Sequence, residues 1–178
     1  MTAPGPLSAL GPVVQIAYLP SDFDASIKYW TETVGVGPFF LMENIHLGGM
    51  KYLGKPTDSV FTIAIAYWND IQIELIRPEN DAPSIYNGEY AVKDRMHHIC
   101  IFVDSIEDAR RACAEIGAEV LVEGTVGDSG AVIYVDAGGG PGNVIELLQP
   151  IKGSEALFDM VRNAAKNWDG TDPVRKLG

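Results

Sequence analysis

One pattern of elements, namely strand, helix, strand, strand, strand, occurs twice along this chain of 178 residues. Runs of branched apolar residues predict the strands, and apolar spacings of three and four predict the helices. The first copy comprises the segments 13–19, 23–34, 37–47, 60–68 and 71–78. The second copy comprises the segments 96–103, 106–116, 118–124, 131–137 and 143–150. An internal repeat constrains the fold strongly, because each unit must bury its apolar face against its neighbour.

Short polar and glycine-rich signals mark where these elements begin and end. Ser21 and Asp22 precede the first helix and Ser105 precedes the second, where a side-chain oxygen can accept from the free N–H groups of the first turn. The turn at 69–70 predicts a hairpin between the last two strands of the first copy. That copy is the longer one, because it holds an extra segment near 48–58 that we expect to be a loop.

The repeat divides the chain into five parts of an α+β protein. They are a loose N-terminal leader at 1–10, a first module at 11–78, a connector at 79–95, a second module at 96–150 and a helical extension at 151–178. In the extension, Leu157, Met160, Val161 and Ala164 share one face of the expected helix.

The charge of the chain argues against several classes of partner. The net charge is −11, so we expect no nucleic-acid partner and no binding to an anionic membrane surface. No apolar run approaches the roughly 20 residues of a membrane span, and the N-terminus lacks the basic region of a secretory signal. The two cysteines, Cys100 and Cys113, form no C-x-x-C pair, which favours reduced thiols and a cytoplasmic location.

Two similar phrases, IQIELIRP and VIELLQP, each place one glutamate in an apolar strand that ends at a proline. Side chains alternate across a strand, so Glu146 shares one apolar face with Val144 and Leu148, and the opposite face is apolar too. Such a strand is covered on both sides, where a lone ionised carboxylate costs several kcal/mol. Glu74 occupies the corresponding place in the first phrase.

Four residues able to bind a metal occupy matching strand positions in the two copies: Gln15, Glu74, His98 and Glu146. Taken singly, Glu74 could face solvent in an amphipathic strand, and Gln15 could be a hydrogen-bonded amide of the core. His97 would point to the face opposite His98 and would be structural. The agreement across both copies favours one shared metal over coincidence.

With these residues, the chain resembles the vicinal oxygen chelate superfamily, to which glyoxalase I, methylmalonyl-CoA epimerase, extradiol dioxygenases and bleomycin-resistance proteins belong. The resemblance spans roughly residues 11–150. The phrase HHICIFVDSIEDA is similar to the second-module opening of methylmalonyl-CoA epimerases, VIELLQP resembles the last strand across the superfamily, and NDAPSIY is similar to the connector of glyoxalase-like members. The resemblance implies two βαβββ modules that form a cup-shaped, eight-stranded mixed sheet around one metal ion.

The same resemblance assigns the metal ligands to Gln15, Glu74, His98 and Glu146, a set similar to that of zinc-type glyoxalase I. Mixed oxygen and nitrogen donors fit one divalent ion of zinc, nickel, cobalt or manganese, among which we favour zinc. Such an ion would stabilise an enolate and acidify the adjacent C–H bond. For the catalytic base that moves the proton, we expect Glu146 first, Glu74 second and Glu43 third.

Residues that share a strand face with the ligands predict the substrate contacts Leu19, Gln72, Cys100 and Phe102. This lining is apolar apart from Gln72, so we expect a small carbonyl substrate with an apolar or aromatic body. Leu19 stands where zinc-type glyoxalase I has an arginine that helps to bind glutathione. The sequence therefore does not favour a glutathione substrate.

Three functions stay open on the sequence. The first is a metal-dependent lyase or isomerase, including an epimerase, that works through a metal-stabilised enolate. The others are a metal-assisted hydrolase and a metal-free ligand-binding protein of the bleomycin-resistance type. The resemblance also implies a homodimer, and the C-terminal helix could cover the cup, pack on the outer side of the sheet or bridge that dimer.

Overall fold

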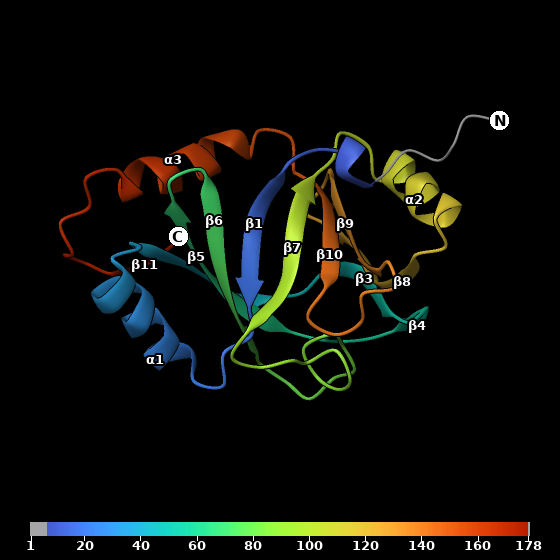
Figure 1. Cartoon of the computed structure of the whole chain (residues 1–178), viewed down its shortest axis with the longest axis horizontal. Coiled ribbons are helices and arrows are strands. Elements are labelled where there is room, and N and C mark those ends of the chain that lie inside the picture. The colour runs from blue at the N-terminus through green and yellow to red at the C-terminus, as the bar shows by residue number, and fades with distance from the viewer. Residues whose placement is uncertain (1–6, 178) are drawn as a thin grey trace.

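The computed structural model describes residues 7–177, in which two βαβββ modules share one mixed sheet (Figure 1). The first module comprises β1 (Val13–Tyr18), α1 (Phe23–Lys28), a π-helical continuation η2 (Tyr29–Val34), β2 (Phe39–Ile45), β5 (Phe61–Trp68) and β6 (Ile71–Pro78). The second comprises β7 (Met96–Phe102), α2 (Ile106–Glu115), β8 (Glu119–Val126), β9 (Gly130–Asp136) and β10 (Val144–Gln149). The predicted α+β fold of two βαβββ modules is confirmed.

The strands that begin and end each module lie side by side at the centre of the sheet (Figure 1). The strand order is β11-β2-β5-β6-β1-β7-β10-β9-β8-β3-β4. The first strands of the two modules, β1 and β7, pair antiparallel, and each pairs on its other side with the last strand of its own module, in parallel. The four strands that carry the expected ligands are therefore direct neighbours.

Three further strands extend the eight-stranded core to eleven. The segment near 48–58 was expected to be a loop, and this was wrong, because it contains β3 (Gly48–Tyr52) and β4 (Lys55–Pro56). Its sequence is poor in β-branched residues, and its strand conformation follows from pairing with β8 of the other module. At the opposite edge, β11 (Val174–Lys176) adds to β2.

Helices α1 and α2 cover the outer face of the sheet, one on each module. Phe23 and Ile27 of α1 pack against Ile73 and Leu75, which point away from the face of Glu74. Asp22 accepts a hydrogen bond from the backbone N–H of Ala25 at 2.9 Å, and this bond fixes the start of α1.

The short 3-10 helix η1 (Leu7–Ala9) lies beside the apolar cluster between α2 and the sheet, and it is part of the expected leader at 1–10. Leu7 and Leu10 pack there against the cluster around α2. Residues 1–6 of that leader lie outside the described residues. Within the described range, no helix is both long and apolar enough to cross a membrane.

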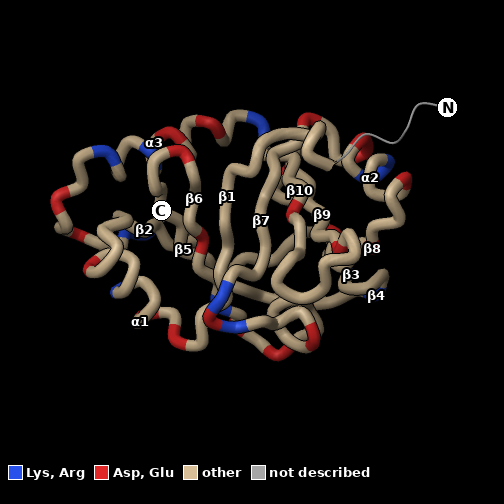
Figure 2. The backbone as a smooth tube through the Cα atoms, viewed as in Figure 1, with Lys and Arg blue, Asp and Glu red and all other residues tan. Residues whose placement is uncertain are grey.

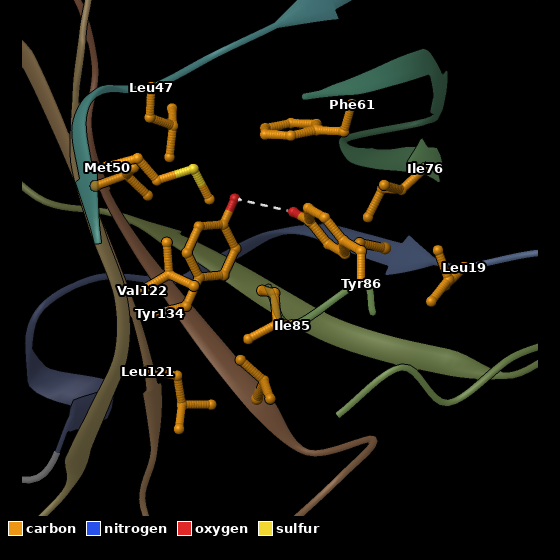
Figure 3. Packing of buried hydrophobic residues seen from close by; sticks show 13 residues of the cluster. Leu19, Leu47, Met50, Phe61, Ile76, Ile85, Tyr86, Leu121, Val122 and Tyr134 are labelled. Carbon is orange, nitrogen blue, oxygen red and sulfur yellow. Dashed lines mark hydrogen bonds between the residues drawn. The ribbon is translucent and has the colours of Figure 1, made fainter. Parts of the chain in front are cut away.

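The inner face of the sheet carries a separate apolar cluster, which Figure 3 shows in part. Phe61 of β5, Tyr86 of the connector and Tyr134 of β9 meet there, with the hydroxyl oxygens of the two tyrosines 3.5 Å apart. The connector at 79–95 is thus part of the core. Its Ser84 and Ile85 are fully buried.

The C-terminal helix α3 (Glu155–Ala165) lies on the inner side of the sheet, which is the first of the three arrangements that the sequence left open. Val161 is fully buried against Phe40, Ile65 and Tyr67, and Ile65 pairs in register with Glu74. At the other module, Phe158 contacts Phe102 with ring centroids 5.3 Å apart. The helix therefore covers the cup.

Candidate metal centre and substrate cavity

Three ionisable side chains from three central strands converge on the inner face of the sheet. Glu74 of β6, His98 of β7 and Glu146 of β10 each offer a ligand atom, and these atoms lie within 4.8 Å of one another. The Nε2 atom of His98 is 3.2 Å from Oε2 of Glu146 and 3.5 Å from Oε2 of Glu74. His98 is 0% exposed and each glutamate is 6% exposed, so water does little to stabilise their charges.

Strand register brings these residues together. Ala17 of β1 pairs with Glu74 on one side and with His98 on the other, and Glu146 pairs with Cys100, two residues after His98. Residues paired across neighbouring strands project on the same face of a sheet. Since Ala17 has only a methyl group, space is left above it for the longer side chains of Glu74 and His98.

The fourth expected ligand, Gln15, is held in a chain of amide hydrogen bonds. Nε2 of Gln15 donates to Oε1 of Gln72 at 2.5 Å, and Nε2 of Gln72 donates to the hydroxyl oxygen of Tyr67 at 3.3 Å. Oε1 of Gln15 is buried and has no hydrogen-bond partner among the described residues. An amide oxygen left free in this way is available to a cation.

Burial and mutual charge shift the pKa values of this cluster. Burial raises the pKa of the Glu74 carboxyl, and the charge of Glu146 adds to this effect, while the nearby imidazole of His98 opposes both. Burial alone would lower the pKa of His98, but the two carboxylates outweigh it and raise the pKa to about 9. In the absence of a metal, the imidazole therefore carries a proton beside the two carboxyl groups.

The donor set fits a divalent cation. Metal–ligand distances of roughly 2.0–2.2 Å place neighbouring donors about 3–3.5 Å apart, which is the spacing observed around Nε2 of His98. No Lys or Arg of the described residues forms an ion pair with Glu74 or Glu146. His98 Nε2 makes no hydrogen bond of standard geometry. The three ionisable groups could hold a metal ion, with the Gln15 amide oxygen as a further donor.

A cavity of about 180 Å3 opens beside the candidate ligands. Its wall includes Met42 of β2 and Val126 of β8, which lie seven strand intervals apart in the sheet. A flat sheet would separate these strands by roughly 34 Å at 4.8 Å per interval. Both strands can border one small cavity only because the sheet curls into a cup.

Three parts of the chain build the cavity wall. Each module contributes residues, including Pro150 at the end of the second, and the extension adds Ile151, Ser154, Leu157 and Phe158. The described wall holds no Lys or Arg and is apolar apart from the candidate ligands, Gln72, Tyr134 and Ser154. The cavity therefore suits a small, uncharged apolar group.

The expected substrate contacts divide into two pairs. Gln72 and Phe102 line the cavity. Leu19 and Cys100 are 0% exposed and do not border it. Leu19 lies in the inner apolar cluster. Cys100 lies on β7, two residues after His98, where burial and the nearby glutamates raise the pKa of its thiol. The third candidate base, Glu43, is outside the cavity and pairs with Lys176 at 2.7 Å.

Sequence analysis missed two features of this site. Tyr134 lines the cavity beside His98, with ring centroids 5.2 Å apart, and alternation along β9 could have placed it on the inner face. The expectation that His97 points away from His98 was wrong, because Nδ1 of His97 lies 3.0 Å from Nδ1 of His98. A bulge in β7 causes this difference, and nothing in the sequence marks it.

Comparisons with known proteins agree with this architecture. The sequence profile of the Glyoxalase/Bleomycin resistance protein/Dioxygenase superfamily matches residues 14–135. No curated protein matches the chain in sequence. Among solved structures, a hypothetical protein from Bacillus halodurans superposes with a TM-score of 0.56 at 17% identity, covering 79% of this chain and 94% of that one.

Two methylmalonyl-CoA epimerases are also similar in structure. The enzyme from Streptomyces coelicolor, in complex with 2-nitronate-propionyl-CoA, gives a TM-score of 0.53 at 16% identity, with 79% of this chain and 94% of that one covered. The enzyme from Mycobacterium tuberculosis gives 0.51 at 13% identity, with 81% and 91% covered. At these identities the likeness concerns the fold.

Proposed function

The chain belongs to the Glyoxalase/Bleomycin resistance protein/Dioxygenase superfamily, also called the vicinal oxygen chelate superfamily, and we propose that it is a metal-dependent lyase or isomerase within it. The substrate is a small carbonyl compound with an acidic C–H bond and an apolar or aromatic body. One divalent ion, for which we favour zinc, is held by Gln15, Glu74, His98 and Glu146.

A single observation carries this proposal: two buried carboxylates and an imidazole nitrogen converge at the wall of an otherwise apolar cavity. Two buried carboxylates side by side cost free energy and add nothing to the core. A divalent cation removes this cost. The cavity then gives a substrate access to the same point, because Gln15, Glu74 and Glu146 all line it.

The residues of the site have different chemical roles. A divalent ion held here supplies Lewis-acid stabilisation of negative charge on a substrate oxygen. Glu146 accepts the proton from carbon, and Glu74 is the second candidate for that role. A cation held at the site would favour the ionised form of a carboxylate that ligates it. The apolar wall excludes water from the carbanionic carbon.

The epimerases among the structural neighbours support proton transfer as the reaction type, since one of them is described in complex with methylmalonyl-CoA. Epimerisation at a carbon beside a carbonyl group can proceed by removal of its proton and return of a proton to the other face. A cavity of about 180 Å3 without Lys or Arg favours an uncharged buried part of the substrate. An engineered apolar cavity of roughly 150 Å3 holds benzene, so this part is about the size of one aromatic ring.

The test combines metal content with proton exchange. Protein purified without chelator should contain about one divalent ion per chain. It should also catalyse exchange with D2O of the proton on the carbon beside the carbonyl group of small ketones that carry a phenyl or branched alkyl group, which NMR detects without knowledge of the final product. Protein that contains no ion and binds apolar ligands without exchange would instead be a ligand-binding protein of the bleomycin-resistance type.

A further inference from the structure

A bulge in β7 places two consecutive histidines on the same side of the sheet. Ala17 of β1 pairs with His98, whereas the next residue, Tyr18, pairs with Met96. One step along β1 thus matches two steps along β7, and His97 is the extra residue. Bulges reorient a side chain in this way and are common beside active sites. The ring nitrogens of the two histidines consequently lie 3.0 Å apart, Nδ1 to Nδ1.

The far nitrogen of His97 is anchored to the connector. Its Nε2 atom lies 3.0 Å from the backbone oxygen of Ile85. A carbonyl oxygen can only accept, so Nε2 of His97 carries the proton in this bond. His97 is 0% exposed and packs against the ring of Tyr86 at 5.4 Å, and both Ile85 and Tyr86 belong to the inner apolar cluster (Figure 3).

We propose that His97 is a positioning residue that fixes the ring orientation and the tautomer of His98, so that Nε2 of His98 faces Glu74 and Glu146. The connector at 79–95 supplies the fixed point through the carbonyl group of Ile85. This inference rests on the proposed metal site, because it assigns to His97 a role in holding the metal ligand.

One arrangement of protons satisfies every contact in this chain of groups. A neutral His98 that binds a metal through Nε2 carries its proton on Nδ1. That proton is donated to Nδ1 of His97, which is free to accept because the proton of His97 is on Nε2. The Nε2 proton of His97 is donated to the oxygen of Ile85. Metal-binding histidines generally need such a partner on their other nitrogen, and its loss costs 10- to 100-fold in metal affinity.

NMR of the histidine rings tests the proton arrangement directly. The chain has three histidines, so spectra of the His46→Gln and His97→Asn variants assign all ring nitrogens. In the zinc-loaded wild type we expect a proton on Nδ1 of His98, with a nitrogen–nitrogen coupling across the hydrogen bond to Nδ1 of His97. Coordination of zinc through Nδ1 of His98, or an Nδ1 of His98 without a proton, would overturn the inference.

Two variants of His97 separate positioning from packing. His97→Phe retains a planar ring against Tyr86 but removes the acceptor, so calorimetric titration with zinc should show a 10- to 100-fold loss of affinity. His97→Asn retains an acceptor near the position of Nδ1, so it should bind zinc at least threefold more tightly than His97→Phe does. His46→Gln, a change at a histidine that bonds to the backbone of Ser59, serves as the matched control with wild-type affinity. Wild-type zinc affinity in folded His97→Phe would refute the positioning role.

If the proposed function is wrong, the experiments give a different result from the one expected if only the role of His97 is wrong. If the wild type binds no divalent ion, the metal site is wrong. The coupling between Nδ1 of His98 and Nδ1 of His97 can still be measured in that metal-free protein. Its presence would support the orienting role of His97, and its absence would contradict it. The same spectrum decides the inference if His97→Phe fails to fold.

Discussion

At the scale of single residues, the site consists of buried polar side chains that the packing of an apolar core does not require. Glu74 and Glu146 could be recognised from the sequence because the same strand phrase occurs twice, and His98 and Gln15 because they align across the copies. His97 could not be placed correctly, since a bulge reverses side-chain direction without changing the alternation of residue types. Leu19 shared the predicted face, but face alone does not tell which residues border an open space.

The carboxylate of Glu146 gives the sharpest prediction at this scale. Glu146→Gln should lower zinc affinity by about 100-fold or more, because it removes one of two charged ligands, and it should abolish proton exchange. The metal-free variant should be as stable as the wild type or more so, because one buried charge is gone. Zinc calorimetry, the exchange assay and urea unfolding measure these effects. Glu43→Gln, at an acid outside the cavity, is the control, and full exchange activity in Glu146→Gln would exclude Glu146 as the base.

At the scale of elements, loops and helices determine what the strands enclose. The two module cores could be predicted from hydrophobic alternation and helix caps. The strand β3 could not, because the residues that make it a strand lie in β8 of the other module. The position of α3 depended on which apolar surface its Leu157 and Val161 would meet, and the sequence of the helix does not specify that surface.

The wall formed by α3 predicts a selective effect on aromatic ligands. Phe158 lines the cavity, and an aromatic contact between its ring and a bound phenyl ring is worth about 1 kcal/mol, so benzohydroxamate, an aromatic metal ligand, should bind about fivefold more weakly to zinc-loaded Phe158→Ala. Acetohydroxamate and zinc itself should bind as to the wild type. Met160→Ala is the matched control, because Met160 lies on the same helix but is 42% exposed and does not line the cavity, although the sequence placed it on the face of Leu157 and Val161. An equal loss of affinity for both hydroxamates would mean that Phe158 does not border the bound ligand.

The loop between β9 and β10 predicts a pH effect on stability. Hydrogen bonds from the backbone of Gly140 hold the pKa of Asp136 below its usual value of 3.8, with further donors at Gly138 and at the hydroxyl of Tyr90, 2.8 Å away. A carboxylate with a depressed pKa stabilises the fold above its unfolded-state pKa, and this contribution disappears as the pH falls through the folded-state value.

Asp136→Asn should therefore destabilise the protein by about 1 kcal/mol at pH 7, since hydrogen bonds to a charged acceptor are lost. The difference should shrink as the pH falls through the depressed folded-state pKa of Asp136, because below that pKa both proteins are neutral at this position. Urea unfolding across the pH range measures it. Asp70→Asn, in the exposed turn between β5 and β6, is the control for the loss of one surface carboxylate. A destabilisation that persists unchanged at low pH would show that the charge of Asp136 is not its source.

At the scale of the whole molecule, the candidate metal centre joins the two modules. Gln15 and Glu74 come from the first module, and His98 and Glu146 come from the second. Acidic residues outnumber basic ones over the surface, while the central strands carry few charges of either sign (Figure 2). The buried acids of the metal centre are therefore exceptional for their surroundings. The homodimer implied by the family resemblance stays a prediction.

Because both modules supply ligands, metal binding should stabilise the molecule as one unit. Zinc at 100 times its dissociation constant should raise the free energy of unfolding by about 2.7 kcal/mol. Calorimetry should show a single transition that moves to higher temperature with zinc and returns to the metal-free temperature with a chelator. Glu146→Gln should show little zinc-dependent shift under the same conditions. A zinc-dependent shift confined to one of two separate transitions would mean that the ion does not bridge the modules.

The most direct measurement for the whole account is anomalous X-ray diffraction from crystals of the protein purified without chelator. The account predicts one anomalous peak per chain on the inner face of the sheet, within about 2.0–2.4 Å of Oε atoms of Glu74 and Glu146, Oε1 of Gln15 and Nε2 of His98. An anomalous peak at another place in the molecule, or no peak at these four residues after the crystals are saturated with zinc, would contradict it.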